Sequence, residues 1–300
     1  MAIRYIKQKD INYTLWDRCI NNSINGAVYA YSWYLNFVAE HWDALVENDY
    51  RSVMPLVYRK RFFFKEIFTP LPTRQLGIFS EKPINSDKID KFLKAIPKSF
   101  KKIDIFFNRQ NTQSLKSYPQ KMSVIYELDL IMPYGKKKNF YSTIVKESIS
   151  LALEKKLRVR KGVALSDFEA FIRENIHEIS INNLIDPLHN ILQHLLHIRN
   201  AEILGVYNDK NILYAAACFI RSNHDVVLLY ACSGRQGIQE KANYLLFDSF
   251  LESYSTRNVT LSIEHIDKNW NGEFYKGFGA IESNFCCFSQ NRLPFFLKWT

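Results

Sequence analysis

Two titratable side chains follow a short alternating segment in the last quarter of the chain. Val259, Leu261 and Ile263 alternate with polar residues, which predicts a strand. Glu264 and His265 come directly after it, where a carboxylate or an imidazole can face a bound substrate. A general base needs only to reach the proton of an amine within hydrogen-bond distance. Both residues are therefore candidate catalytic bases, and a solvated pair at a strand end is the alternative.

Two further groups could carry chemistry. Cys232 comes directly after a buried strand and could act as a nucleophile, although packing in the core explains it more simply. His189, His194 and His197 cluster, and the last two share one face of a predicted helix. Because no Cys or carboxylate stands near them at ligand spacing, we expect no metal site.

Several common sequence motifs do not occur in this chain. It has no Gly-x-Gly-x-x-Gly, no phosphate-loop Lys, no Gly-x-Ser-x-Gly and no His-Glu-x-x-His. Dinucleotide-dependent oxidoreductases, P-loop nucleotidases, elbow-type serine hydrolases and zincin proteases therefore have no direct support.

Length and composition indicate a globular protein. Its 300 residues are 47% hydrophobic, and at about 100 to 200 residues per domain we expect two domains. No apolar run approaches the roughly 18 residues that span a bilayer, and Met1–Asp10 lacks the apolar segment of a signal peptide. The five cysteines are odd in number and lie mostly in apolar runs, which does not suggest a disulfide framework. We expect a cytoplasmic protein without a transmembrane segment.

The chain is basic, with a formal charge of +10. Such a charge attracts polyanions such as RNA, nucleotide phosphates or an anionic membrane surface. The densest basic clusters are Arg59–Arg61, Lys98 with Lys101–Lys102, Lys136–Lys138 and Arg158–Lys161. The segment Arg59–Lys65 places three aromatic rings among four cations, which is the composition of surfaces that bind nucleic acids. It also reads as an ordinary connection between two strands, which is the simpler interpretation.

The stretch from Ile212 to Ala280 contains the clearest pattern. Ile212–Ile220 and Val226–Ala231 are apolar runs separated by a turn, which predicts a hairpin buried on both faces. Residues 233–237 interrupt the pattern, and apolar residues then return at helical spacing from Ala242 to Leu251. The alternating strand, a short aromatic helix and a final strand at Phe285–Phe288 follow.

Both halves of the chain give nearly the same order of elements. We expect two similar domains, residues 1–131 and 132–300, with a linker helix at 137–156 in the second. The repeat concerns the order of elements and not the residues themselves.

This element order, with a helix after the central hairpin and a Tyr-x-x-Phe-Gly ending, resembles the GNAT acyltransferase superfamily. Two such domains in one chain look like its tandem, bacterial Fem-type branch (FemAB-like), the peptidyl and aminoacyl transferases of cell-wall synthesis. The segments that carry the likeness are Trp33–Leu35, Trp42–Val46, Asp49–Tyr50, Val53–Leu56, Gln75–Ser80, Ala242–Leu246 and Phe274–Ala280.

The resemblance implies an α/β (α+β) fold in which each domain has a mixed, largely antiparallel sheet flanked by helices. In such enzymes two central strands part and expose amides to the acyl carbonyl, and the next helix aims its N-terminal amides at the pyrophosphate of acetyl-CoA. A tyrosine of the late helix protonates the leaving thiolate, and Tyr275 matches that position. A core aromatic is the alternative for Tyr275. The residues that would line the acyl donor are Tyr230, Ala231, Cys232, Ser233, Gly234, Arg235, Gly237, Lys241 and Ala242.

One position departs from the acetyl-CoA motif of that superfamily. When the last position of that motif is aligned on Ala242, its first position falls on Gly237. A position where the motif has glycine then falls on Glu240. A side chain there blocks close approach, and its carboxylate repels phosphate. This argues against acetyl-CoA in that pose. The resemblance to Fem-type proteins implies aminoacyl-tRNA as donor instead, which suits the basic charge, although the helical-hairpin insertion of several Fem proteins has no counterpart here.

The sequence thus predicts an acyltransferase that moves an acetyl or aminoacyl group to a primary amine of a small molecule or peptide precursor. Acetyl-CoA, another acyl donor or aminoacyl-tRNA are the candidate co-substrates, and no metal is expected. The alternative is a catalytically inactive GNAT-like module that binds a polyanion or a protein partner in the inter-domain cleft.

Overall fold

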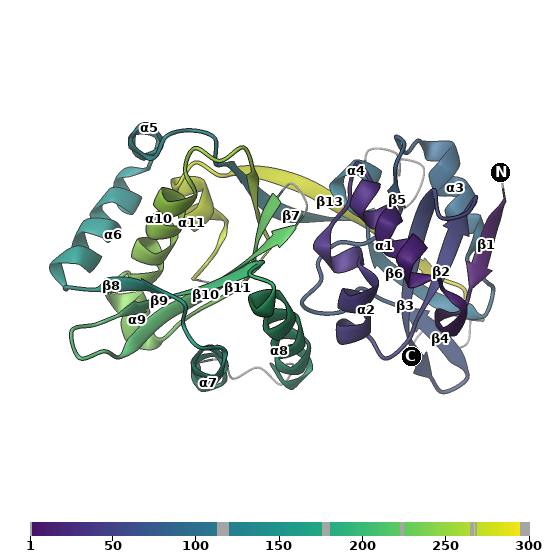
Figure 1. The fold of residues 1–300 in the computed structure, drawn as a ribbon, viewed down its shortest axis with the longest axis horizontal. Helices are drawn as coiled ribbons and strands as arrows, with labels where there is room; N and C mark the ends of the chain where they lie inside the picture. Colours follow the sequence, from purple (N-terminus) through teal and green to yellow (C-terminus); the bar gives the residue numbers. More distant parts are fainter. Residues whose placement is uncertain are drawn as a thin grey trace. The chain divides into compact units, whose positions relative to one another are not determined.

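The computed structural model describes residues 2–112, 120–175, 181–222, 225–264, 267 and 269–294. The chain forms two compact units (Figure 1). The first comprises residues 1–124 and 284–300, and the second comprises residues 125–283. The domain boundary predicted after Ile131 would place the last strand in the second domain. That strand instead enters the first unit, because its later residues find their hydrogen-bond partners there.

The first unit is a mixed sheet with helices packed on it. Its strands are β1 (Ile3–Ile6), β2 (Trp42–Glu47), β3 (Ser52–Arg61), β4 (Phe64–Ile67), β5 (Phe79–Ser80), β6 (Phe100–Phe106) and the end of β13 (Ile281–Asn291). They lie in the order β1-β2-β3-β4-β6-β13, with β5 beside β3. The pair β4–β6 is parallel, and the pairs β1–β2, β2–β3, β3–β4, β3–β5 and β6–β13 are antiparallel. The α-helices are α1 (Tyr13–Asn22), α2 (Ser32–Val38), α3 (Ser86–Ala95) and α4 (Arg109–Thr112).

The second unit repeats this plan. Its strands are β7 (Gln120–Asp129), β8 (Arg158–Lys161), β9 (Ala201–Tyr207), β10 (Leu213–Ser222), β11 (Asp225–Ser233) and β12 (Thr260–Ile263). They lie in the order β7-β12-β11-β10-β9-β8, and β11–β12 is the parallel pair. The helices are α5 (Tyr134–Asn139), α6 (Thr143–Glu154), α7 (Leu165–Asn175), α8 (Ile181–His197), α9 (Arg235–Gln239), α10 (Ala242–Tyr254) and α11 (Gly272–Gly277). Across the described residues, no helix combines the length and the apolar character needed to cross a bilayer.

The structure confirms the predicted fold class and the central hairpin. Strands β10 and β11 pair antiparallel from Ala215 with Ser233 to Ser222 with Asp225. The expected linker helix at 137–156 was wrong as a single element. The structure divides it into α5 and α6, because the Ser142 side chain accepts the Val145 N–H at 3.3 Å and starts a new helix.

Helix α10 is the centre of the second core. It packs on β9 and β10 on one side and on α6 on the other. The rings of Phe219 in β10 and Phe250 in α10 stack with their centroids 3.7 Å apart and an interplanar angle of 6°. A helix covered on several sides is apolar around most of its surface, which explains why its sequence lacks a sharp polar face.

One buried carboxylate ties the β3–β4 hairpin of the first unit to β6. Glu66 of β4 is 5% exposed and contacts Arg59 at 2.7 Å, Arg61 at 3.3 Å and Lys102 at 3.0 Å. Burial alone would raise the pKa of this carboxyl, but hydrogen bonds from Arg59 and Lys102 outweigh it and lower the pKa to about 2. The ionised carboxylate is therefore part of the folded structure.

The substitution Glu66→Gln is expected to destabilise the protein at pH 7. Because the folded pKa lies below the unfolded value, the contribution of Glu66 is complete above about pH 4.5 and is lost as the pH falls toward about 2. The stability difference between wild type and variant should therefore shrink over that window. Urea unfolding followed by tryptophan fluorescence at a series of pH values measures it.

The matched control is Glu154→Gln, which alters an exposed carboxylate at the end of α6. Its stability should stay close to that of wild type at each pH. A Glu66→Gln difference that is constant between pH 5 and pH 2 would contradict the assigned role of the carboxylate.

Candidate functional site

Strands β11 and β12 part before β11 ends. In the described part of the chain, their parallel pairing runs from Asp225 with Thr260 to Leu228 with Ile263. Strand β11 continues to Ser233 and stays paired with β10 on its other side. Main-chain groups of residues 229–233 thus lie along an edge that β12 has left.

A bulge lies at the point where the strands part. Cys218 of β10 is opposite Tyr230, whereas Phe219 is opposite Leu228, so Leu229 is an extra residue on β11. Bulges bend a strand and re-aim its peptide groups, and they are frequent beside active sites. A short row of amides at such a bend can stabilise the negative charge that develops on a carbonyl oxygen.

The segment after β12 reaches back to the end of β11. The Trp270 Nε1–H donates to Ser233 Oγ at 3.1 Å, and the ring is fully buried. Asp267 Oδ1 accepts the N–H groups of Asn269 and Trp270 at 2.6 and 2.8 Å and fixes this turn. The Asn243 side chain of α10 donates to the Asn269 carbonyl at 3.3 Å. Trp270 thereby lines the end of the parted region.

Two of the three candidate acid and base residues, Tyr275 and Glu264, lie among the described residues. Tyr275 in α11 is fully buried, and its ring packs against Phe247 of α10 and Tyr126 of β7, with centroids 5.5 and 5.8 Å away. Glu264 follows β12 directly and is 2% exposed. His265 lies outside the described residues. The roles of all three stay predictions.

The residues expected to line an acyl donor form one continuous strand–helix–helix segment. Tyr230, Ala231, Cys232 and Ser233 end β11; Gly234 caps α9, which holds Arg235 and Gly237; Lys241 precedes α10, which begins at Ala242. The structure places them in sequence along the edge that β12 has left and at the start of α10. Their contact with a donor stays a prediction.

The segment before α10 is a closed helical turn. The N–H groups of Ile238, Glu240 and Lys241 donate to carbonyls of the same segment at 2.9 to 3.3 Å. The Gln236 side chain donates to Glu240 Oε1 at 2.7 Å. A phosphate group would therefore meet a carboxylate and amides that are already bonded.

Gly237 has a packing reason in this turn. A Cβ atom at Gly237 would lie 2.0 Å from the carbonyl oxygen of Tyr214 in β10. The glycine lets α9 approach the sheet backbone closely. The sequence placed Gly237 in the acyl-donor motif, and the structure adds this second explanation.

The cysteine and histidine candidates have ordinary surroundings. Burial raises the pKa of the Cys232 thiol to about 12, so at neutral pH it is not a thiolate nucleophile. His189 Nδ1 lies 2.7 Å from Glu169 Oε1 in an ion pair or hydrogen bond between α8 and α7. Over the residues that the structure describes, no three His, Cys, Asp or Glu side chains group as metal ligands.

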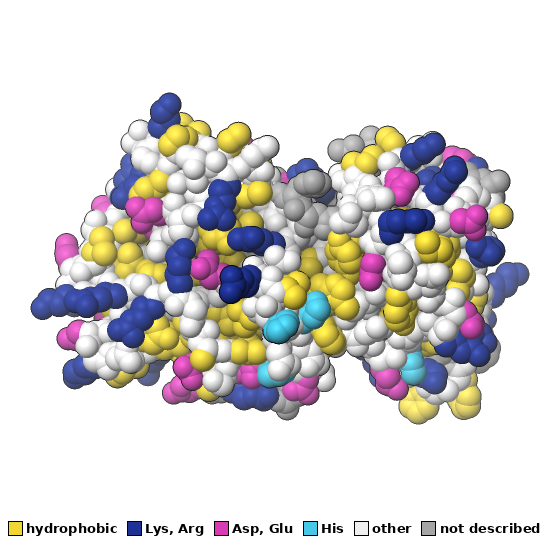
Figure 2. Space-filling model, viewed as in Figure 1, with side chains coloured by type: hydrophobic (Ala, Val, Ile, Leu, Met, Phe, Trp, Pro, Cys, Tyr) yellow, Lys and Arg dark blue, Asp and Glu magenta, His cyan; other side chains and the backbone are white. Residues whose placement is uncertain are grey.

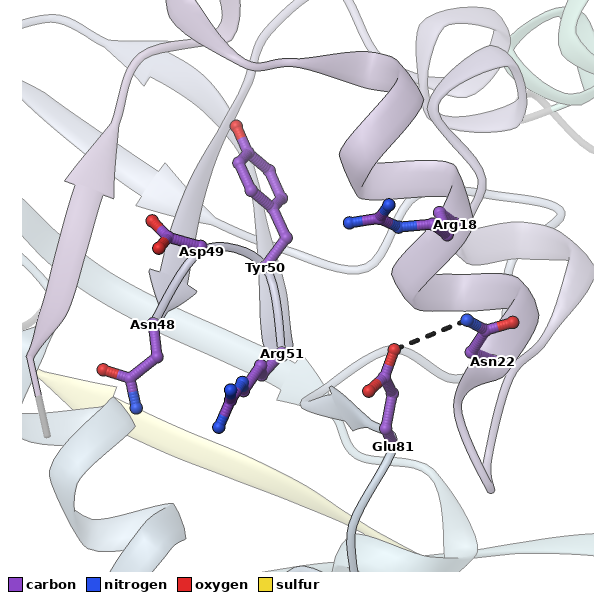
Figure 3. A pocket seen from close by; sticks show the side chains of 7 residues that line it. All are labelled: Arg18, Asn22, Asn48, Asp49, Tyr50, Arg51 and Glu81. Carbon is purple, nitrogen blue, oxygen red and sulfur yellow. Dashed lines mark hydrogen bonds between the residues drawn. The ribbon is translucent and has the colours of Figure 1, made fainter.

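The first unit has a polar hollow of about 590 Å³. Figure 3 shows the two arginines that line it, Arg18 of α1 and Arg51 after the β2–β3 turn. Glu81 lies between Arg51 and Asn22 in this view. Glu81 accepts from Asn22 at 3.5 Å. Two cations and the nearby acids Asp49 and Glu81 suit a small ligand that carries both charges, although all the charged side chains are exposed.

The second unit has a basic hollow of about 450 Å³. Arg199, Arg221 and Arg257 line it, and its one carboxylate, Glu202, lies 3.6 Å from Lys161. On the face shown in Figure 2, Lys and Arg side chains gather on the second unit. Such a hollow can hold an anionic group, and the Arg257 side chain also donates to the Ser253 carbonyl at the end of α10 at 3.4 Å.

Sequence reasoning missed three features of these sites. Trp270 was not singled out from the sequence, because nothing in its local sequence indicates that its indole N–H has a partner at Ser233. The two hollows collect residues that are far apart in the chain, such as Arg18 with Glu81 and Lys161 with Arg257. The large number of Lys and Arg residues could have suggested arginine-rich sites. It could not have shown which arginines lie together in the folded chain.

Structural comparison identifies relatives that cover nearly the whole chain. A crystal structure of FemX has a TM-score of 0.62 at 12% identity and covers 95% of this chain and 97% of its own. A tandem GNAT protein from the clavulanic acid biosynthesis pathway has a TM-score of 0.56 at 9% identity, covering 98% and 99%. L-PGS from Bacillus licheniformis has a TM-score of 0.54 at 9% identity, covering 94% and 93%. The chain therefore has a tandem GNAT-like fold with a Fem-type protein among its structural relatives.

No protein-family profile and no curated protein matches the chain by sequence.

The substitution Gly237→Ala is expected to destabilise the protein by about 1 to 3 kcal/mol or more, because the added methyl meets the Tyr214 carbonyl. Chemical unfolding followed by circular dichroism measures the change. Gly135→Ala in α5 is the control, since a Cβ there meets nothing within 4 Å. It should be neutral or stabilise the helix by up to about 1 kcal/mol. Equal effects of the two substitutions would refute the packing role of Gly237.

Proposed function

We propose that this protein is an acyltransferase that moves an acetyl or aminoacyl group to a primary amine of a small molecule or peptide precursor. The observation that carries the proposal is the early end of the pairing between β11 and β12 after Leu228 and Ile263. The tandem GNAT-like fold and the crystal structure of FemX as a structural relative support it.

In the proposed reaction the acyl carbonyl lies against main-chain amides of β11 beyond Leu228. The amine nitrogen attacks the carbonyl carbon and gives its proton to Glu264 or His265. The bond to the leaving oxygen or sulfur then breaks, and Tyr275 supplies the proton to that atom. Positioning and stabilisation of the oxyanion provide most of the rate acceleration.

Two classes of acyl donor fit the proposal differently. The closed turn at α9 and the Glu240 carboxylate weigh against a pyrophosphate at the start of α10. Aminoacyl-tRNA needs no pyrophosphate grip, and the charge of +10 favours a nucleic-acid donor. We therefore favour aminoacyl-tRNA over acetyl-CoA. The residues proposed to line the donor are the β11–α10 segment described above.

The second candidate is a module that binds a polyanion without catalysis. The observation that favours it is the basic hollow of Arg199, Arg221 and Arg257. If this candidate is correct, Arg221→Gln will weaken polyanion binding, and no tested donor will be consumed.

A donor screen separates the two candidates. Thermal shift and calorimetry are measured with acetyl-CoA, longer acyl-CoAs and aminoacyl-tRNA, since a ligand that binds the folded state raises the melting temperature. Each donor that binds is then incubated with primary amines, and acyl transfer is followed by mass spectrometry. Transfer supports the acyltransferase. A donor that binds and is never consumed supports the module. If none of the donors binds, the result counts against the acyltransferase.

With the donor found, Tyr275→Phe should lower kcat while the donor Kd stays within a few-fold. The ring stays in its packing against Phe247, and only the proton donor is lost. Tyr254→Phe, which removes a hydroxyl at the far end of α10, is the control and should leave kcat unchanged. Unchanged turnover in Tyr275→Phe would remove this residue from the mechanism.

A further inference from the structure

The β3–β4 hairpin carries two exposed phenylalanines at its tip. Arg61 pairs with Phe64, so Phe62 and Phe63 form a two-residue loop. Their exposed fractions are 98% and 101%. Figure 1 shows this hairpin extending beyond the rest of the first unit at the bottom of the view, and Figure 2 shows hydrophobic side chains protruding at the same edge.

Turn chemistry does not account for these residues. Two-residue hairpin loops favour Asn-Gly, Asp-Gly or Gly pairs, because one or both positions need a positive φ. Phe62 has a φ of 40°, in a region that a bulky side chain rarely adopts. Exposure of two aromatic rings to water, together with a turn conformation that these residues disfavour, destabilises an isolated hairpin. They suit a hairpin whose tip is covered by another apolar phase.

The same hairpin is strongly basic. Residues 59–66 hold four cations and one carboxylate. Lys65 lies 3.8 Å from Asp43 and 4.2 Å from the centroid of the Tyr58 ring, so it faces the first unit, whereas Lys60 is exposed. Glu66 is shared by three cations, Arg59, Arg61 and Lys102, so this flank keeps an excess of positive charge that a nearby anion would offset. The tip therefore joins an apolar end to a flank that favours negative charge.

We propose that the β3–β4 hairpin docks on an anionic lipid surface, with Phe62 and Phe63 in the interface and the exposed Lys60 side chain among the headgroups. Aromatic and basic residues together give this kind of reversible binding. A single-stranded nucleic acid fits less well. Its bases stack on rings along a groove that also follows the backbone, whereas this hairpin presents its two rings at a projecting end. This inference does not depend on the proposed acyl transfer.

Vesicle co-sedimentation of the full-length protein tests the proposal. Vesicles of phosphatidylcholine with about 30 mol% phosphatidylglycerol are compared with phosphatidylcholine alone. The wild type should bind the anionic vesicles more strongly, and added salt should weaken that binding. The double variant Phe62→Ser/Phe63→Ser should lower the partition coefficient at least about 10-fold, since two apolar side chains no longer leave water. Lys60→Gln should lower it about 5-fold.

The matched control is Phe140→Ser, which removes a 68% exposed phenylalanine from the second unit. It should leave vesicle binding unchanged. Because Phe62 and Phe63 are fully exposed, the double variant should keep the wild-type melting temperature, so lost binding cannot come from unfolding. In a separate measurement, Phe62→Trp should gain fluorescence that brominated lipids quench, beyond the quenching of the wild type.

Three results would overturn the proposal. The first is equal vesicle binding by the wild type and the double Phe variant. The second is a wild-type dimer in sedimentation equilibrium that the double variant dissociates, which would assign the tip to a second copy of the chain. The third combines two findings. In fluorescence anisotropy the wild type binds labelled single-stranded RNA and the double variant does not, and the wild type does not bind anionic vesicles.

Discussion

Over the described residues the parallel pairing of β11 with β12 runs no further than Leu228 and Ile263, and the rest of the candidate site depends on this limit. If the pairing continued, the amides beyond Leu228 would donate to β12 and none would face a ligand. The bulge at Leu229 marks the place where β11 turns away while it keeps its bonds to β10. A small irregularity in one ladder thus separates a closed sheet from a sheet with an open edge.

The start of α10 shows how one segment meets two competing demands. Lys241 is the N-cap residue before α10. It has a φ of 60°, and its side chain makes no capping hydrogen bond. The preceding turn bonds its own amides, and Gly237 allows that turn to lie against Tyr214 of β10. A segment closed in this way stabilises the sheet end, but it offers fewer free donors to a phosphate. The same argument, together with the Glu240 carboxylate, favours a donor that does not need to be held at this turn.

The sequence was informative where a pattern had one physical solution. The runs of β10 and β11 could only be a buried hairpin, and the apolar spacing after Ala242 could only be a helix. It was less informative where side-chain partners decide the outcome. The split between α5 and α6 lies at residues 140–142, which are not helical, and the Ser142 side chain caps the second helix with one hydrogen bond. The site could be predicted as a segment, but the placement of Trp270 against Ser233 needs tertiary packing that no local pattern encodes.

Positions that break local rules identify the parts of this chain that folding alone does not explain. Asn48, Asp49 and Tyr50 are three successive residues with positive φ, and the turn they form borders the polar hollow of the first unit. Phe62 adopts the same region at the aromatic tip. At Tyr50 and Phe62 this backbone costs about 1 to 2 kcal/mol, whereas Asn and Asp adopt it more readily because their short side chains bond the local backbone. Strained residues of this kind concentrate at functional sites, where the surrounding structure holds them in place. The second unit has such residues as well, Lys241 at the start of α10 and Thr256 after its end, so backbone strain marks positions in both units.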